Sequence, residues 1–217
     1  MKIVGIDLSG PSNHKDTAVA VFSDQGDSLY LDRLLNPASD QDILSLITNL
    51  SAEQQVVVGI DAPLSYEDGG GDRELEKELR SFTKELGMKS GSIMPPTLTK
   101  MIYLTVRGMK LASLLSDLMN IQVIEVHPGA TLAARIPGEE GRKHALLYKR
   151  SLESRDWIAN WMISFGLKGI QVNLLQTSHL IDSCAAAIAA WDYVSPNRKP
   201  AWSYDANSPY HPYPFSC

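Results

Sequence analysis

Two segments of the chain run an apolar stretch directly into an aspartate. Asp7 follows IVGI near the start of the sequence, and Asp61 follows VVVGI. Glu125 lies inside the apolar segment IQVIEVHP, and Asp182 precedes a run of alanines, three residues after His179. An unpaired charge in apolar surroundings costs roughly several kcal/mol. These acids therefore need a partner.

The apolar segments around the first three acids are typical of buried strands. In open sheets with crossover helices, ligands bind beyond the carboxyl ends of the parallel strands. We therefore expect Asp7, Asp61 and Glu125 to meet at one edge of a sheet. The spacing of His179 and Asp182 places both on one face of a helix. For each aspartate alone, a capping or turn-forming role is the simpler explanation, and it is the whole set that favours a shared site.

Clustered carboxylates repel one another and are tolerated chiefly where a cation holds them together. Ligands that are all oxygen favour a hard ion, Mg²⁺ or Mn²⁺, over zinc. We expect Asp7, Asp61, Glu125 and Asp182 to be the metal ligands. Two such ions about 4 Å apart would clamp the attacking water and the leaving oxygen of a phosphodiester in line. The acids thus predict metal-dependent hydrolysis.

The elements that must position these acids are those of an α/β protein. Three closely spaced strands, at 2–8, 17–23 and 27–35, favour an antiparallel meander. A helix at 40–50 and a buried strand ending at Asp61 form a crossover, which predicts that this fourth strand is parallel to the sheet. The remaining pattern predicts a strand at 121–128 and helices at 72–86, 97–119, 130–135, 144–166 and 177–194.

A chain of 217 residues is best read as one domain with an elaboration. We expect a single domain over 1–194, with a helical insertion around 66–120. Residues 195–217 are rich in Pro and aromatic side chains. They are expected to form an irregular tail that packs back on the body.

The composition limits the class of protein. A net charge of −5 argues weakly against a broad basic face for nucleic acid, although a local patch is compatible with it. The longest apolar stretch is much shorter than the roughly 20 residues of a membrane span, and Asp7 comes too early for a signal peptide. Cys184 and Cys217 lack the spacing of metal ligands. We expect a cytoplasmic protein with reduced thiols and no membrane partner.

Five motifs give the chain a resemblance to a known family. They are spread from the first strand to the last helix: GIDLSG at 5–10, GIDAPLS at 59–65, MPP at 94–96, IEVHPGAT at 124–131 and HLIDSCAAAIAA at 179–190. With them the chain resembles the predicted RNase H-like nuclease family, domain of unknown function four-twenty-nine, of the ribonuclease H-like superfamily. The resemblance implies a mixed five-stranded sheet, three antiparallel strands then two parallel ones, flanked by helices, and a metal-dependent nuclease site.

The resemblance also implies a role for each acid. Asp7 would bridge two metal ions, Asp61 and Glu125 would be ligands at the strand ends, and Asp182 would complete the site from the last helix. Many relatives would carry an Asp where this chain has His179. A His three residues before the helical Asp is similar to the arrangement in some Holliday-junction resolvases, so His179 is expected to be a ligand or a proton relay.

Contacts to nucleic-acid phosphates would require cations near this site. Arg73, Lys100 and Arg107 are the candidates, with Lys84 and Lys89 as further ones, although a solvated helix face is the simpler explanation for each. Three tyrosines of the tail could stack on bases or pack over the core: Tyr204, Tyr210 and Tyr213.

Two other interpretations stay open at this stage. An actin-like or sugar-kinase-type nucleotide-binding protein uses a related sheet, and EDGGGD at 67–72 could be a phosphate loop, but such proteins need two domains of this kind. A non-catalytic binding or scaffold protein would keep the fold without a metal. The sequence also leaves open whether the substrate is DNA or RNA, whether cleavage is exo or endo, and whether the chain forms a homodimer, as resolvases must.

Overall fold

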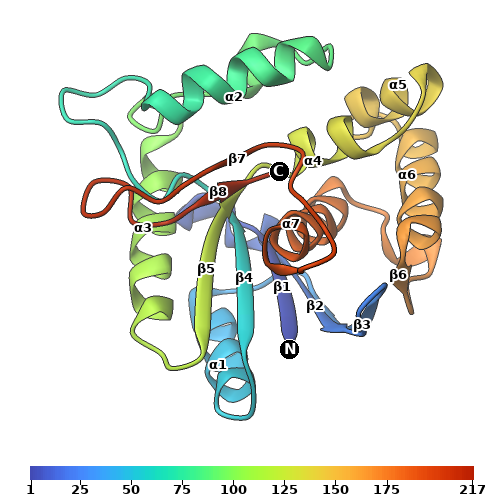
Figure 1. Cartoon of the computed structure of the whole chain (residues 1–217), viewed down its shortest axis with the longest axis horizontal. Coiled ribbons are helices and arrows are strands. Elements are labelled where there is room, and N and C mark those ends of the chain that lie inside the picture. Colours follow the sequence, from blue (N-terminus) through green and yellow to red (C-terminus); the bar gives the residue numbers. More distant parts are fainter.

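The computed structural model describes residues 1–217 and shows an α/β fold built on one mixed sheet flanked by helices. The sheet has eight strands in the order β6-β3-β2-β1-β4-β5-β8-β7 (Figure 1). Five long strands form its centre: β1 Lys2–Asp7, β2 Ala18–Asp24, β3 Leu29–Leu35, β4 Val56–Asp61 and β5 Ile121–Val126. The expected sheet of five strands was too small, because three two-residue strands are too short to leave a pattern: β6 Leu167–Lys168, β7 Ser203–Tyr204 and β8 Phe215–Ser216.

The pairing of the long strands follows from the connections between them. Strands β1, β2 and β3 pair antiparallel, as their short links require. The helix α1, Asp40–Ser51, begins at a capping box formed by Ser39 and Asp42. It returns the chain across the sheet, so β4 pairs parallel with β1, and β5 pairs parallel with β4.

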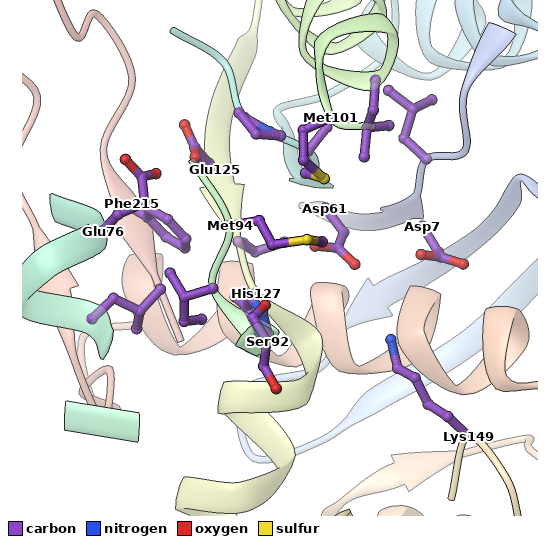
Figure 2. Close-up of a pocket in the computed structure, with 17 residues that line it drawn as sticks. Asp7, Asp61, Glu76, Ser92, Met94, Met101, Glu125, His127, Lys149 and Phe215 are labelled. Carbon is purple, nitrogen blue, oxygen red and sulfur yellow. The ribbon is translucent and has the colours of Figure 1, made fainter. Parts of the chain in front are cut away.

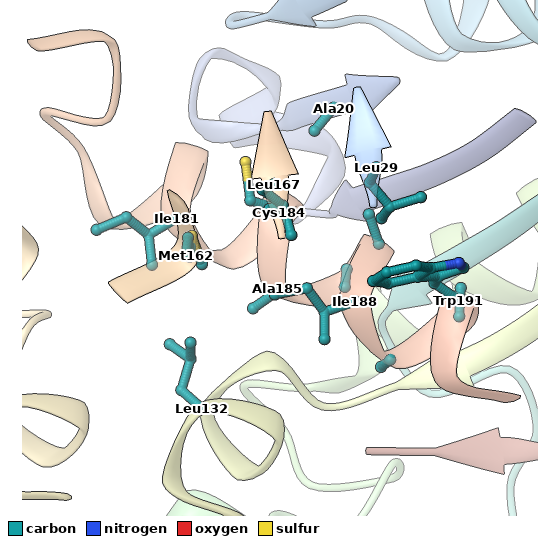
Figure 3. Close-up of a cluster of buried hydrophobic side chains, with 14 of the residues drawn as sticks. Ala20, Leu29, Leu132, Met162, Leu167, Ile181, Cys184, Ala185, Ile188 and Trp191 are labelled. Atoms are coloured by element: carbon teal, nitrogen blue, oxygen red, sulfur yellow. The ribbon is translucent and has the colours of Figure 1, made fainter. Parts of the chain in front are cut away.

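One face of the sheet is covered by α7, Ser178–Val194, which is buried over most of its length. Its alanines allow a very close approach: a Cβ on Gly5 would lie 1.9 Å from the carbonyl oxygen of Ser183, and one on Gly59 would lie 2.6 Å from that of Ala186. Figure 3 shows Ile188 and Trp191 of α7 packed with residues of the sheet and the neighbouring helices. The small residues of α7 therefore set how near the helix lies to β1 and β4.

The opposite face is covered by α1 and by α3, Ile102–Ser116. Two further helices, α4 Pro128–Arg135 and α6 Leu152–Phe165, pack against α7 and share its core. The remaining two are α2 Glu74–Glu85 and α5 Glu139–Leu147 (Figure 1). The single helix expected at 144–166 is divided, because Ser151 caps a new helix by accepting a hydrogen bond from the Ser154 amide. None of the helices combines the length and the apolar character needed to cross a lipid bilayer.

The tail is more regular than expected. Strand β8 pairs parallel with β5 beside Glu125, and β7 pairs antiparallel with β8. These short strands extend the sheet on the side of β5, so residues near the end of the sequence lie next to the central strands (Figure 1).

Candidate active site

Asp7 and Asp61 end two neighbouring parallel strands and are paired in register. Side chains in register on adjacent strands point to the same face, and here that face is the one that α7 covers. Asp7 is buried and Asp61 is half-buried. Both line a cavity of about 260 Å³, in which Figure 2 shows their carboxylates side by side. The structure thus brings these two predicted site residues together.

Burial raises the pKa values of both carboxylates, and neighbouring negative charges add to the effect. Burial, together with the charges of Asp7 and Asp182, raises the pKa of Asp61 well above its usual range. Burial also raises the pKa of Asp7 to about 6, although a hydrogen bond from His179 opposes the increase. The Asp61 carboxylate faces the cavity. The pair therefore carries negative charge that a cation would stabilise.

Helix α7 delivers His179 and Asp182 to the same edge of the sheet. Thr177 caps the helix by accepting a hydrogen bond from the Leu180 amide, which fixes the first turn. His179 Nδ1 lies 2.7 Å from Asp7 Oδ2, and this hydrogen bond raises the pKa of the imidazole above its ordinary value. Nδ1 is therefore the protonated nitrogen that donates to Asp7, and Nε2 is left for another partner.

Asp182 is buried and lies between two groups that the sequence did not indicate. It accepts a hydrogen bond from the Tyr148 hydroxyl, and its Oδ2 lies 3.1 Å from Lys149 Nζ. The Lys149 side chain is 59% exposed. Partial desolvation lowers its pKa, but the charges of Asp182 and Asp61 raise it more, to above its ordinary value. Lys149 therefore stays protonated and lines the cavity together with Asp7 and Asp61 (Figure 2). The segment LLYKR carries no motif that would have singled out this lysine.

Glu125 does not join the aspartates. It is paired with Ile60, one residue before Asp61, so its side chain points to the opposite face of the sheet. There it forms a buried ion pair with Arg73 and accepts a hydrogen bond of 3.0 Å from the Leu64 amide. Glu76 binds the same guanidinium. The partner that Glu125 needed is an arginine of the same chain, and the expected set of four carboxylates is reduced to three.

Two of the residues expected to contact phosphates, Arg73 and Arg107, instead form ion pairs with acids of the same chain. Arg73 is 1% exposed and is held by Glu76 and Glu125. Arg107 is 5% exposed, with its guanidinium 2.7 Å from Asp40 Oδ1. Neither side chain is available to a phosphate. Lys100 is exposed, as are Lys84 and Lys89. Two of the three tail tyrosines have partners within the protein: Tyr204 stacks with Trp202, and the Tyr213 hydroxyl accepts a hydrogen bond from the Ser116 hydroxyl. Tyr210 is exposed.

His127, in the motif EVHP, is a second residue that the site contains without having been predicted. Its Nδ1 accepts a hydrogen bond from the Ala130 amide and so caps α4. Its Nε2 lies 3.2 Å from the carbonyl oxygen of Ser92, to which it donates. Burial lowers the pKa of the imidazole. The ring is therefore neutral, with both nitrogens in use.

The residues present fit one divalent cation better than two. No group of three or more His, Cys, Asp or Glu side chains is arranged so that it could hold a metal ion. The reason is that Asp7 turns toward His179 and Asp182 toward Tyr148 and Lys149. Mg²⁺, however, commonly keeps several waters and binds through only one or two carboxylates and substrate phosphate. The adjacent carboxylates of Asp7 and Asp61 would be the ligands of such an ion.

Comparison with protein families gives one match. The family model described as "Protein of unknown function (DUF429)" matches residues 5–199, which include every residue of the site described above. No curated protein and no solved structure matches the chain significantly.

Proposed function

We propose that this chain, which belongs to the DUF429 family of proteins of unknown function, is an RNase H-like nuclease that hydrolyses phosphodiester bonds in nucleic acid with Mg²⁺ or Mn²⁺. The observation that carries the proposal is the pair Asp7 and Asp61, in register at the carboxyl ends of two central parallel strands.

The order of elements supports the proposal. Three antiparallel strands and two parallel strands form the centre of the sheet, and a crossover helix connects the two groups. Helix α7, near the end of the chain, brings His179 and Asp182 to the strand ends. This arrangement is similar to that of the ribonuclease H-like superfamily, which also uses an acid on the first strand, one on the fourth and others on the last helix.

Asp7 and Asp61 would hold the cation. When bound, such an ion activates water at neutral pH and neutralises charge on the phosphate. Asp182 would contribute through its charge and by orienting Lys149. A second ion would need a further ligand, and Glu125 is committed to Arg73. The single-ion arrangement is therefore the one that this site supports.

His179 is placed to move a proton. Because its Nδ1–H donates to Asp7, its Nε2 is the nitrogen that can take a proton from water or return one to the leaving oxygen. The side chain is 39% exposed, so Nε2 has access to solvent. The hydrogen bond to Asp7 raises the pKa of the imidazole, which makes the neutral ring a stronger base toward water.

Lys149 is placed to bind the scissile phosphate. It is the cation that shares the cavity with the aspartates, and its raised pKa makes it a permanent charge and a poor proton donor. A fixed ammonium beside a reacting phosphate stabilises the charge that develops in the transition state.

The test combines metal binding with cleavage. Titration calorimetry with Mn²⁺ should show binding to the wild type and none to Asp7→Asn or Asp61→Asn. Single-stranded DNA, single-stranded RNA, an RNA–DNA hybrid and a branched DNA should then be incubated with each protein. We expect at least one substrate to be cut by the wild type alone. Metal-free nucleic-acid binding that Asp7→Asn leaves unchanged, without cleavage, would instead support a scaffold protein.

A further inference from the structure

We propose that the cavity beside Asp7 and Asp61 is a binding site for one unpaired nucleobase, so that the preferred substrate is single-stranded or carries a base that has left its stack. This inference rests on the proposed nuclease function and names the class of substrate for it. It is carried by the size of the cavity, the chemistry of its walls and its position next to the aspartates.

The size of the cavity matches one base. Its volume is about 260 Å³, which is near the lower limit of small-molecule sites, roughly 300 Å³. Atoms bonded in a ring pack more closely than separate water molecules, each of which takes up about 30 Å³. The cavity therefore has room for one nucleobase.

The walls of the cavity differ between its two ends, and the end that contains Phe215 also contains the carboxylates of Glu76 and Glu125. Asp7, Asp61 and Lys149 lie toward one side, Phe215 lies toward the other, and Met94 lies between them (Figure 2). Leu79 and Ile93 add apolar surface. Thioethers and an aromatic ring are suitable neighbours for the flat face of a base. A nucleotide with its base at this end would place its phosphate toward the aspartates.

The charged groups near Phe215 and the imidazole of His127 already have partners within the protein, and among the neutral polar side chains of the cavity the Ser92 hydroxyl has none. Glu76 and Glu125 share the guanidinium of Arg73, and both nitrogens of His127 are hydrogen-bonded within the chain. Reading a base requires free donors and acceptors for its edge. The cavity therefore recognises the shape and the apolar face of a base, and we expect little preference among the four bases.

The position of Asp7 explains why a paired base would be excluded. The aspartate is only 8% exposed and is reached through the cavity. A phosphate in a duplex is attached to bases that are stacked and paired, and enzymes with enclosed sites need the nucleotide to be extruded or unpaired first. Single strands and frayed ends meet this condition without that cost.

The binding test uses uncharged deoxynucleosides, because a phosphate would be repelled by the aspartates in the absence of a cation. Saturation-transfer NMR with deoxyadenosine, deoxycytidine, deoxyguanosine and thymidine should show contact with the wild-type protein, with affinities that agree within about threefold. Met94→Trp fills the cavity and should abolish the contact. Met119→Trp is the matched control, because Met119 is 83% exposed and lies away from the cavity. If Met94→Trp fails to fold, Met101→Trp fills the cavity from another wall.

The cleavage test compares a single strand with the same sequence as a blunt duplex in Mn²⁺. We expect the single strand to be cut at least about tenfold faster, and Met94→Trp to lose at least about tenfold on it, which is within the range that stacking on one base provides. Equal cleavage of the duplex, or nucleoside binding that Met94→Trp leaves intact, would overturn the inference. Nucleoside binding without any cleavage would reject the nuclease and leave the base site standing. If the protein cleaves nucleic acid normally but binds no nucleoside, the base site is rejected and the proposed nuclease function stands.

Discussion

Asp7 and Asp61 are paired in register across β1 and β4, with both carboxylates directed toward α7. Burial raises the pKa of both acids, and the charge of Asp7 adds to the effect at Asp61. The fold therefore keeps an unfavourable pair of acids at its centre. Sites of this kind commonly reduce stability in exchange for function.

The first prediction concerns Asp61→Asn, which removes one charge of the pair. We expect the variant to be more stable than the wild type at pH 7.5, by about 1–3 kcal/mol, because a buried carboxylate with a raised pKa opposes folding once it is ionised. Urea unfolding without metal measures the difference. Added Mn²⁺ should stabilise the wild type only, and equal stabilisation of both proteins would contradict the proposed ligand.

The second prediction is a pH dependence that belongs to Asp7. Its pKa is about 6 in the folded protein and about 3.8 in the unfolded chain, so between these values the folded state holds more protons. The stability from this group is complete below pH 4 and decreases as the pH rises through 6, by about 3 kcal/mol in total. The difference in unfolding free energy between wild type and Asp7→Asn should shift by this amount between pH 4 and 7. A constant difference would contradict it.

The third prediction separates a structural role for Glu125 from a role as metal ligand. Glu125→Gln leaves the buried guanidinium of Arg73 with only Glu76 as its charged partner, and should cost about 3–5 kcal/mol. A triple variant with Arg73→Met and Glu76→Gln leaves no member of this buried ion-pair cluster charged, so it should recover part of the loss, which urea unfolding of the single and triple variants measures. Mn²⁺ affinity at a temperature where the variant is folded should stay within about threefold. A larger loss would restore Glu125 as a ligand.

The fourth prediction is that Lys149→Met strengthens metal binding but slows cleavage. Lys149→Met removes the positive charge beside Asp182 and Asp61, so Mn²⁺ should bind about three- to tenfold more tightly, while cleavage should become at least about tenfold slower at subsaturating substrate. Calorimetry and initial rates measure the two effects. Lys143→Met on the exposed side of α5 is the matched control and should change neither. Weaker Mn²⁺ binding by Lys149→Met would show that the lysine only supports the fold.

The fifth prediction concerns the approach of α7 to the sheet. In Gly5→Ala the added Cβ would meet the backbone of Ser183 and Ala187 at 1.9 and 2.4 Å, so we expect a loss of about 3 kcal/mol or failure to fold. Gly10→Ala, where no atom lies within 4 Å of the new Cβ, should be nearly neutral. Thermal unfolding of both variants gives the comparison, and equal melting temperatures would contradict the packing described for α7.

Much of the central fold was predictable from the sequence. Apolar runs and short links identified the meander of β1, β2 and β3, and the helix before β4 fixed its parallel direction. The short strands were not predictable, because two residues carry no periodicity and β8 forms only where β5 offers an open edge. The division between α5 and α6 depends on one cap, Ser151, within an otherwise helical pattern.

The site was predictable only in part, for a geometric reason. Asp7 and Asp61 follow equivalent strands at equivalent positions, so their spacing was sufficient to place them together. Glu125 lies one position out of step with Asp61, and a shift of one residue in a strand reverses the face. Lys149 and Tyr148 reach Asp182 from the end of α5, a contact that only the tertiary packing establishes.

The pairing of β8 with β5 also has a meaning for the order of protein synthesis. The ribosome releases Asp7 and Asp61 early, but His179 and Asp182 follow much later, and Phe215, which forms a wall of the cavity, later still. A nascent chain thus carries the acids long before it can enclose them. If the protein cuts nucleic acid as we propose, its nascent chain lacks one wall of the cavity until the last residues have been added.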